Sequence, residues 1–489
     1  MVIGYGISFL KEAVIANYYG VSSDVDAYTI AITIPVTLFA LVSVAIHSIV
    51  IPLYSNLLYN KGQAEASAYI NNLITVTGLF TLLFIVICEV LAGPLTYLFA
   101  PGFSEETHAK AVLLLRICMP TVFFSALEKI FIGLLNVHKI FILPSFAVYL
   151  LNIGIITSIV LLHEQIGISA ACIGQVVGSI LQALFLVFLA RKIYSFKYTF
   201  SIKNDLMKKT ARQSLPVFWS ISIAELCAVI NRVVASFLFV GSIAALGYAS
   251  KINGVMMTFF TAAISTIVYP LYAESAAKKS MSQLNSRINF TLSVYSFFLI
   301  PLMCGILCYK RELIILAFGR GAFDAAAIDV TQSLFGFYSF GLLFMAFRDT
   351  LTKVFYSLQD TKTPAKNATI GVIFNILLNL SLPFFLGVNG LAIATSLTSI
   401  LITTLLLKDL RKKHSEMTFK ILFKNIVPTI IAAIVMTLVL LMFKHFITIT
   451  NLWIVLGVGG GIGVLSYLVA GVLLRNPIIS EMKSMLINK

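Results

Sequence analysis

Fourteen apolar runs of about 20 residues each divide this chain of 489 residues. A helix of that length crosses the roughly 30 Å hydrocarbon core of a bilayer. Because lipid offers no hydrogen bonds, a spanning segment must pair its backbone N–H and C=O groups internally, as a helix does. The runs therefore predict an all-α integral membrane protein with about 14 transmembrane helices. They lie near residues 2–19, 26–54, 69–92, 109–136, 142–162, 166–190, 213–239, 244–272, 288–308, 328–357, 364–386, 388–407, 420–443 and 452–474.

The composition excludes several classes of protein. Only 11% of the residues are charged, against about 25% in soluble proteins. All six cysteines fall inside apolar runs, so we expect neither disulfides nor a zinc site. The longest loop, near residues 191–212, carries one acidic residue, Asp205, which argues against an enzyme. The chain has no G-x-x-x-x-G-K-[ST] phosphate loop, so we expect no ATPase.

The loops between the apolar runs alternate in charge. Basic loops follow the even-numbered runs, as in "KKSMSQLNSR" and "DTKTPAK", whereas "SSDVD" and "APGFSEETH" follow odd-numbered runs. Lys and Arg accumulate in cytoplasmic loops, so both termini are predicted to lie in the cytoplasm. Lys310, Arg311 and Arg320, after the ninth run, are the exception. The net charge of +15 is thus a topology signal, with anionic lipid headgroups as a second partner and no role for nucleic acid.

The polar stretch "FYSLQDTKTP" at residues 355–364 has an echo 220 residues upstream in "LLNVHKIFILP", where Pro144 matches Pro364. The same offset pairs Phe103 with Phe323. Because it spans six helices, both copies cross the membrane in the same direction, which is a transporter architecture. We predict two six-helix lobes related by a parallel repeat, plus two C-terminal helices. The expected divisions are residues 1–190, a basic linker at 191–212, residues 213–407, and residues 408–489.

The repeat also aligns charged residues inside the predicted spans, mostly with opposite signs. The aligned pairs are Glu12 with Arg232, Glu128 with Arg348, and Lys129 with Asp349. A charge in the middle of a span costs about 3 kcal/mol, so it normally faces a partner or a cavity. Two interpretations stay open. Glu128–Lys129 and Arg348–Asp349 form structural pairs that hold the lobes in one state, or these charges contact a substrate.

Several stretches together resemble one family. "FYSLQDTKTPAKNA", "FLKEAVIANYYGVSSDVDAYTIAITIP", "APGF" and "INRVVASFLFVGSIAALGYASKI" are similar to the MurJ/MviN lipid II flippases of the multidrug/oligosaccharidyl-lipid/polysaccharide exporter superfamily. The resemblance implies a transporter of the bacterial cytoplasmic membrane, not an enzyme. Its implied substrate is an undecaprenyl-pyrophosphate-linked sugar, foremost lipid II for peptidoglycan synthesis, moved by alternating access. Cell-wall synthesis proteins are further implied partners, and no cofactor is expected beyond coupling to Na+ or to the membrane potential.

The resemblance implies a cationic cavity for the diphosphate. Lys11 and Lys251 match family arginines, keeping the charge without the planar fork of a guanidinium. A pair of family arginines in the second helix falls at Phe39 and Ala40, leaving His47 as that helix's one basic residue. Arg232 and Arg348 would compensate. The loss leaves a flippase for another lipid-linked polysaccharide, such as a capsule or exopolysaccharide unit, as an alternative. A drug/cation antiporter of the same superfamily is a more distant one.

Two further groups have open interpretations. Asp26 matches a family carboxylate at the outer end of the second helix, where it serves either as a helix N-cap or as a gate contact with a cation of the other lobe. The second group resembles a sodium site of some family members. Its side chains form either that site or hydrogen bonds between helices, and its residues are Asn231, Asn375, Asn379 and Thr395.

The predicted orientation is testable by cysteine labelling in whole cells. A cysteine at Ser104 should react with an impermeant thiol reagent added outside, because the loop after the third helix is predicted to be external. Cysteines at Ser201 and Ser282 should stay unlabelled until the membrane is permeabilised. External labelling of Ser201 would reverse the assigned orientation.

Overall fold

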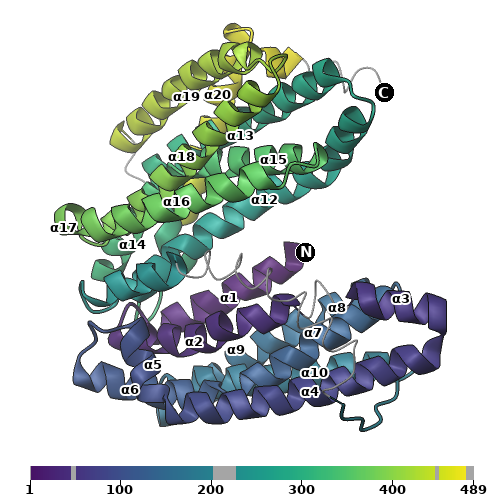
Figure 1. Cartoon of the computed structure of the whole chain (residues 1–489). Helices are drawn as coiled ribbons and strands as arrows, with labels where there is room; N and C mark the ends of the chain where they lie inside the picture. The colour runs from purple at the N-terminus through teal and green to yellow at the C-terminus, as the bar shows by residue number, and fades with distance from the viewer. Residues whose placement is uncertain (1, 46–50, 202–226, 447–450, 481–489) are drawn as a thin grey trace. The chain divides into compact units, whose positions relative to one another are not determined.

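The computed structural model describes residues 2–45, 51–201, 227–446 and 451–480. Throughout these ranges the regular secondary structure is helical and no strand is present, which confirms the all-α class (Figure 1). Among the described residues, seven helices are long and apolar enough to cross a membrane, or nine if each of two bent pairs counts as one span. The protein is therefore a multi-pass membrane protein, and the number of fourteen spans stays a prediction.

The chain divides into two compact units, the first comprising Met1–Ala244 and Gly321–Phe323. Its helices α9 and α10 pack closely at glycines, since a Cβ atom on Gly154 would lie only 2.7 Å from the Cα of Gly178. The described helices of this unit are α1 (Val2–Tyr19), α2 (Ser23–Ala45), α3 (Ile51–Lys61), α4 (Gln63–Val90), α5 (Ala92–Phe99), α6 (Glu105–Cys118), α7 (Thr121–Val137), α8 (Ile142–Ser145), α9 (Ala147–Ile166), α10 (Ser169–Ala190) and Cys227–Ser236.

The second unit comprises Ala245–Arg320 and Asp324–Lys489. Its main core lies among α12, α13, α15 and α18 and includes Tyr295, Phe355 and Leu406. A smaller core joins α13 to the last two helices. The helices are α12 (Ser242–Ala277, whose first three residues belong to the first unit), α13 (Met281–Phe318), α14 (Ala325–Ser339), α15 (Leu342–Ser357), α16 (Lys362–Ser381), α17 (Pro383–Leu386), α18 (Asn389–Lys413), α19 (Lys420–Phe446) and α20 (Leu452–Leu473).

Backbone geometry confirms the internal repeat. The axis bends by 41° between α6 and α7 and by 42° between α14 and α15. Lys139 and Gln359, which are 220 residues apart, both adopt φ of 60° in the turn that follows the bent pair. Gly167 and Gly387, at the same offset, have φ of 56° and 55°. A left-handed φ is uncommon for residues other than glycine, so its recurrence at Lys139 and Gln359 identifies equivalent turns.

The domain boundaries expected from the sequence stay a prediction. Most of the expected linker, from residue 202 onward, and His47 lie outside the described residues. The contacts assign residues up to Ala244 to the first unit, so that unit takes in the described helix Cys227–Ser236, which the repeat assigns to the second lobe.

Arg311, one of the three exceptional basic residues near the end of α13, has a local acidic partner, and so does Lys444 of α19. Arg311 pairs with Asp329 of α14. Lys444 of α19 lies 2.7 Å from a carboxylate oxygen of Glu312 and donates to the Cys308 carbonyl at 2.8 Å. That carbonyl adjoins a kink, where Tyr309 has non-helical φ and ψ of −118° and 19°. Local pairing thus accounts for part of the positive charge that departs from the alternating pattern.

The polar stretch "FYSLQDTKTP" forms a clamp between helix ends in the second unit. Asp360 accepts hydrogen bonds from the Thr363 backbone N–H at 3.0 Å and the Thr363 hydroxyl at 2.7 Å, and so caps the start of α16. The Lys413 ammonium at the end of α18 lies 2.6 Å from the same carboxylate. Lys413 and Thr363 hold the pKa of the Asp360 carboxyl well below its usual range.

Loss of this clamp should lower stability. Asp360→Ala should reduce the free energy of unfolding by about 1 kcal/mol, the usual cost of a lost cap, measured by thermal unfolding of the purified protein. Because folding depresses the pKa of this carboxyl, its contribution is complete above about pH 4 and is lost as the pH falls below that. The variant should therefore differ from the parent at pH 7 and converge with it in acid.

A matched control is available in the exposed pair of Arg311 with Asp329, whose side chains are 46% and 59% exposed. Asp329→Ala should change stability by less than about 0.5 kcal/mol, as is usual for surface ion pairs. Equal effects of the two substitutions would show that the Asp360 clamp does not stabilise this turn more than a surface ion pair does.

Candidate functional site

Lys11 lies in α1 with its ammonium 3.0 Å from Glu12, and the two side chains are 14% and 21% exposed. Neighbouring residues on a helix point in different directions, so this pair forms through the flexible ends of the two side chains. A pair within one helix adds no connection between helices, although it keeps two charges in a partly buried place. The pair thus places the Lys11 ammonium at the position predicted for a cation, and the Lys11–Glu12 contact itself does not join two helices.

The pair Glu128–Lys129 in α7 has the same form, with 3.1 Å between charged atoms. At the equivalent position of α15, Asp349 pairs at 2.6 Å with Lys353, one helical turn further on. Arg348 beside it is half-buried. Sequence reasoning did not identify Lys353, although its spacing of four residues from Asp349 is a standard ion-pair signal. A bond between Glu128 and Arg348 would join the two units and stays a prediction.

Two other predicted cations occupy the segments around the junction of the repeats. Arg232, in the helix Cys227–Ser236, donates to the Ala228 carbonyl at 3.1 Å. Lys251 is half-buried in α12. Lys11 and Lys251 belong to different units, so their joint action on one diphosphate stays a prediction.

Asp26 holds the start of a distant helix. Its side chain is buried, and its two carboxylate oxygens accept the backbone N–H groups of Gly241 at 2.7 Å and Ala244 at 2.8 Å. These N–H groups belong to the first turn of α12 or directly precede it, where a helix has unpaired donors and a partial positive charge. The carboxylate does serve as a cap, as one interpretation expected, but the helix is α12 and not its own α2.

Two glycines let the turn 321–323 pack against the end of α1 within the first unit. Ala322 donates its backbone N–H to the Asn17 carbonyl at 2.8 Å. A Cβ atom on Gly20 would overlap the Ala322 carbonyl, and one on Gly321 would overlap the Asn17 carbonyl. Both glycines also have a left-handed φ, of 60° and 55°, which strains any other residue. The turn 321–323, from the second repeat, therefore seats directly on the end of α1.

The contact has a counterpart made by the equivalent turn of the first repeat. Gly102 donates its N–H to the Ser236 hydroxyl at 3.1 Å, at the end of the helix Cys227–Ser236. We call the residues 17–26, 102, 236–244 and 321–323 the latch. All of them belong to the first unit, and the charge pattern predicts that they lie on the external side. Sequence reasoning found Asp26 and the paired turns but not their mutual contacts.

The candidate sodium-site residues of the second unit form a hydrogen-bonded chain. Asn379 donates to the Asn375 side-chain oxygen at 2.8 Å, and Asn375 donates to the Thr398 hydroxyl at 3.1 Å. Thr398 takes the place expected for Thr395, whose hydroxyl instead donates to the Leu391 carbonyl at 3.1 Å. The interhelical hydrogen bond between α16 and α18 is thus present. Asn231 lies in the other unit, and sodium binding stays a prediction.

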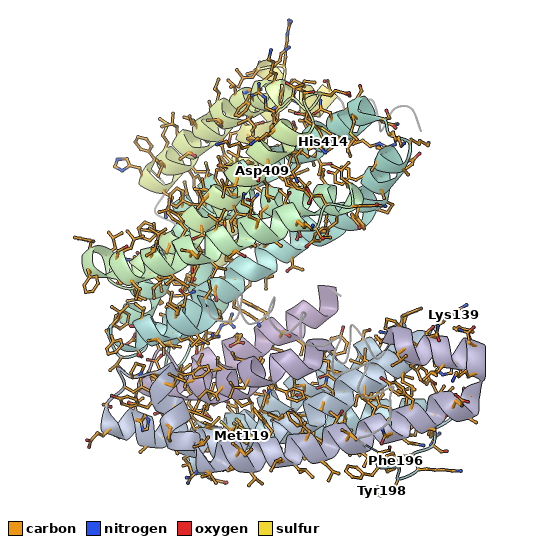
Figure 2. All side chains as sticks on the ribbon, viewed as in Figure 1. Met119, Lys139, Phe196, Tyr198, Asp409 and His414 are labelled. Carbon is orange, nitrogen blue, oxygen red and sulfur yellow. The ribbon has the colours of Figure 1, made fainter. Side chains whose placement is uncertain are left out.

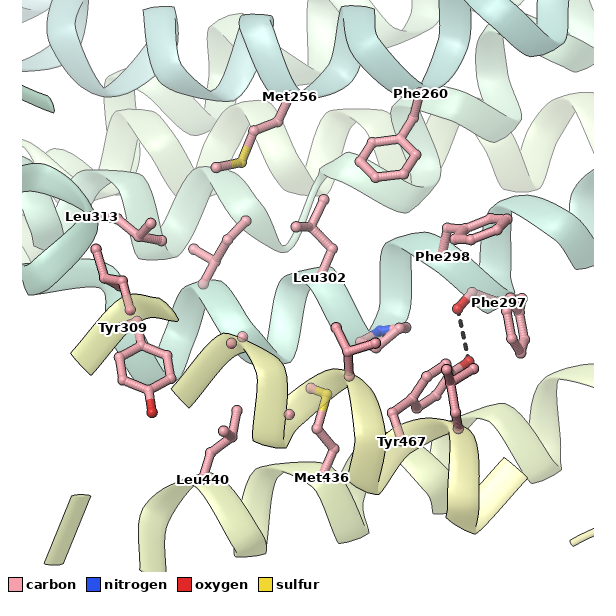
Figure 3. Close-up of a pocket in the computed structure, with 18 of the residues that line it drawn as sticks. Met256, Phe260, Phe297, Phe298, Leu302, Tyr309, Leu313, Met436, Leu440 and Tyr467 are labelled. Carbon is pink, nitrogen blue, oxygen red and sulfur yellow. Dashed lines mark hydrogen bonds between the residues drawn. The ribbon is translucent and has the colours of Figure 1, made fainter. Parts of the chain in front are cut away.

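An apolar cavity of about 560 Å³ opens in the second unit between α12, α13, α19 and α20. Figure 3 shows Met256, Phe260, Leu302 and Leu440 around it. At one side Tyr467 donates its hydroxyl to the Phe297 carbonyl at 2.7 Å, which satisfies a polar atom in this apolar wall. The cavity can hold a hydrocarbon chain but offers little to a charged group.

The glycine-rich sequence of α20 allows close helix packing on one side and leaves open space on another. Gly459 and Gly463 face other helices, because added Cβ atoms would meet the Tyr309 ring and the Leu440 side chain. Gly460 lines the cavity, and a Cβ atom there would meet nothing within 4 Å. Glycine thus brings α20 against α13 and α19 while leaving space on one face.

The described helices have the fold of a class of helical transporters, the multidrug/oligosaccharidyl-lipid/polysaccharide superfamily. A multidrug-resistance MATE family transporter of that superfamily, in an inward-facing conformation, has the same fold with a TM-score of 0.69 at 13% identity, over 85% of this chain and 95% of that one. The family model "Lipid II flippase MurJ" matches residues 15–457, and this chain belongs to that family.

Individual relatives agree over most of their length. The lipid II flippase MurJ of Thermosipho africanus is 28% identical over 396 residues, which cover 81% of this chain and 80% of the relative. The probable lipid II flippase MurJ of Thermotoga maritima is 25% identical, over 89% and 87%. A solved structure of lipid II flippase MurJ in an inward closed conformation superposes with a TM-score of 0.85 at 27% identity, over 98% of both chains.

Removal of the Asp26 carboxylate should loosen the latch. Cysteines in place of Asn17 and Ala322, in a chain freed of its native cysteines, should form a disulfide under mild oxidation. Asp26→Ala should lower the cross-linked fraction, because a lost charged cap costs about 1–2 kcal/mol, which shifts an equilibrium about tenfold. Asp26→Asn, which keeps an acceptor oxygen, should have a smaller effect. Unchanged cross-linking in Asp26→Ala would mean that the latch does not depend on this carboxylate.

Proposed function

We propose that this chain moves lipid II, the lipid-linked precursor of peptidoglycan, across the bacterial cytoplasmic membrane by alternating access. Membership of the lipid II flippase MurJ family over residues 15–457 carries this proposal. Such a protein binds and releases its substrate without making or breaking covalent bonds. Its task is to lower the cost of moving a charged headgroup through a layer that excludes water.

The headgroup requires cations that remain inside the protein. A diphosphate carries about two negative charges, and transfer of an unpaired ion into an apolar medium is prohibitively costly. Lys11 and Lys251 are the family-matched cations, and Arg232 and Arg348 add two guanidinium groups that can bond phosphate oxygens. Binding of the diphosphate at Lys11 would replace or share its contact with Glu12, 3.0 Å away.

The lipid tail requires a separate, apolar place. The cavity of about 560 Å³ between α12, α13, α19 and α20 supplies one, with walls of Met, Phe, Leu and Gly. Burial of the tail stabilises binding by about 25 cal/mol for each Å² of apolar surface removed from water. In this proposal the last two helices, which have no counterpart in the repeat, hold the tail while the headgroup crosses.

The latch serves as the outer gate in this mechanism. With both termini in the cytoplasm, as the charge pattern predicts, the latch residues lie at the external end. The close backbone contacts at Gly20 and Gly321 suit a gate, because they involve no side-chain charge, while the Asp26 carboxylate holds the gate closed through backbone N–H groups at the start of α12. Coupling to Na+ through Asn375 and Asn379, or to the membrane potential, would supply the driving force. Cell-wall synthesis proteins would receive the product.

A flippase for another lipid-linked polysaccharide is the second candidate. The observation in its favour is the replacement of the family's arginine pair in the second helix by Phe39 and Ala40. Rescue of cells depleted of their own lipid II flippase separates the two candidates, because a transporter for capsule or exopolysaccharide units would not restore growth.

Substitutions of the two lysines test the cationic mechanism in the same rescue experiment. Lys11→Arg and Lys251→Arg should restore growth, because arginine keeps the charge and adds a planar fork. The double variant Lys11→Gln, Lys251→Gln should fail to restore growth while reaching the same abundance in the membrane, since glutamine keeps much of the length and loses the cation. Full rescue by the double variant would refute a role for these cations.

A further inference from the structure

The segment after α10 exposes a row of aromatic side chains. Residues 195–201 have no regular secondary structure. Phe196, Tyr198 and Phe200 are 52%, 73% and 49% exposed, whereas Tyr194 is buried. Figure 2 shows Phe196 and Tyr198 pointing away from the helices of the first unit. Aromatic rings exposed in this way beside a membrane-spanning helix are stable where the surroundings are partly apolar, as at the interface between hydrocarbon and headgroups.

Two buried asparagines of α4 hold this segment in an extended form. Asn72 donates to the Ser201 carbonyl at 2.9 Å and accepts the Ser201 N–H at 2.7 Å, so its amide pairs with the backbone as a neighbouring strand would. Asn71 accepts the Lys197 N–H at 3.0 Å and the Tyr194 hydroxyl. In an extended chain alternate side chains point to opposite faces, which places residues 196, 198 and 200 on one face.

The second repeat has the same clamp without the aromatic row. Asn289 donates to the Thr418 carbonyl at 2.8 Å, and Asn285 accepts the Thr418 N–H at 3.2 Å. There Met417 is buried, Phe419 packs against the core, and Glu416 is exposed. A clamp of this kind therefore forms without exposed aromatic rings, so the clamp does not require the rings of the first repeat.

The charge of the segment points to an anionic partner. Residues 191–201 read "RKIYSFKYTFS" and contain three cations and no acid. Arg191, Lys192 and Lys197 are exposed. Aromatic rings are favoured at the boundary between hydrocarbon and headgroups. Basic side chains beside them attract anionic lipids, which are abundant in the cytoplasmic leaflet.

We propose that residues 191–201 form a binding site for anionic phospholipid headgroups at the membrane surface. The asparagine clamp fixes the backbone, and the rings of Phe196, Tyr198 and Phe200 enter the interface. Arg191 and Lys192 hold the phosphates, together with Lys197, whose long side chain reaches around from the opposite face. The site is separate from the transported substrate. It holds the end of α10 at the bilayer surface. Anionic lipids then gather beside the first unit in preference to neutral ones.

Fluorescence quenching by brominated lipids tests the proposal on the full chain in phosphatidylcholine vesicles. Trp219→Phe and Trp453→Phe remove the native tryptophans, and Tyr198→Trp reports on the segment. Brominated phosphatidylglycerol should quench this tryptophan at least about twofold more than brominated phosphatidylcholine at the same mole fraction, because each basic residue near the surface favours anionic lipid. High salt should remove the excess by screening.

Two controls separate lipid charge from general contact with lipid. Leu161→Trp, at an exposed position of α9, should be quenched equally by the two lipids. Neutralising the segment with Arg191→Gln, Lys192→Gln and Lys197→Gln should bring the ratio at position 198 to about one, while the clamp persists because its hydrogen bonds use none of these three side chains. Equal quenching in the parent would overturn the proposal. Absence of quenching by either lipid would also overturn it, since it would place the segment in water or against another protein.

Discussion

The absence of water from the bilayer core governs this structure, because each backbone or side-chain polar group there must find its partner within the protein. Serine and threonine hydroxyls along the helices donate to carbonyls one turn earlier, as Thr75 does to Asn71 and Thr429 to Asn425. Helix starts pose a harder problem, because their first N–H groups have no partner in the same helix. The start of α12 is completed by Asp26, which is 215 residues from Gly241 in sequence. A carboxylate in one repeat thereby becomes a structural part of a helix in the other.

The two repeats apply common solutions to this constraint and then diverge in chemistry. Both bend the same helix pair by about the same angle, and both fasten the segment after their sixth helix with asparagine amides. The side chains placed on these equivalent backbones differ. Charges change sign between Glu128 and Arg348, and the aromatic row of the first repeat is replaced by buried residues in the second. A common backbone thus carries an exposed aromatic row after α10 in the first repeat, while the apolar cavity lies in the second unit.

Sequence reasoning predicted the features that arise from neighbouring residues. Apolar runs identified the helices, and the spacing of 220 residues identified the repeat, because each depends on local composition and order. The contacts between distant segments were beyond it. Asp26 at the start of its own helix is indistinguishable in sequence from Asp26 at the start of α12. Thr395 and Thr398 are both candidates for a bond to Asn375, and only the rotation of α18 selects Thr398. The apolar cavity has no sequence signal, because its lining residues resemble the lipid-facing ones.

The pairing of Lys11 with its neighbour Glu12 has an electrical consequence for the proposed transport. The pair is covalently fixed in α1 and contributes little net charge, so its cation does not travel with the substrate. The charge that crosses the membrane is then that of the diphosphate, about two negative units. Each unit gains about 2.3 kcal/mol per 100 mV when it leaves a cell whose interior is negative. A resting potential of that size would supply about 4.6 kcal/mol per transported molecule, enough to accumulate it on the outer side by more than a thousandfold.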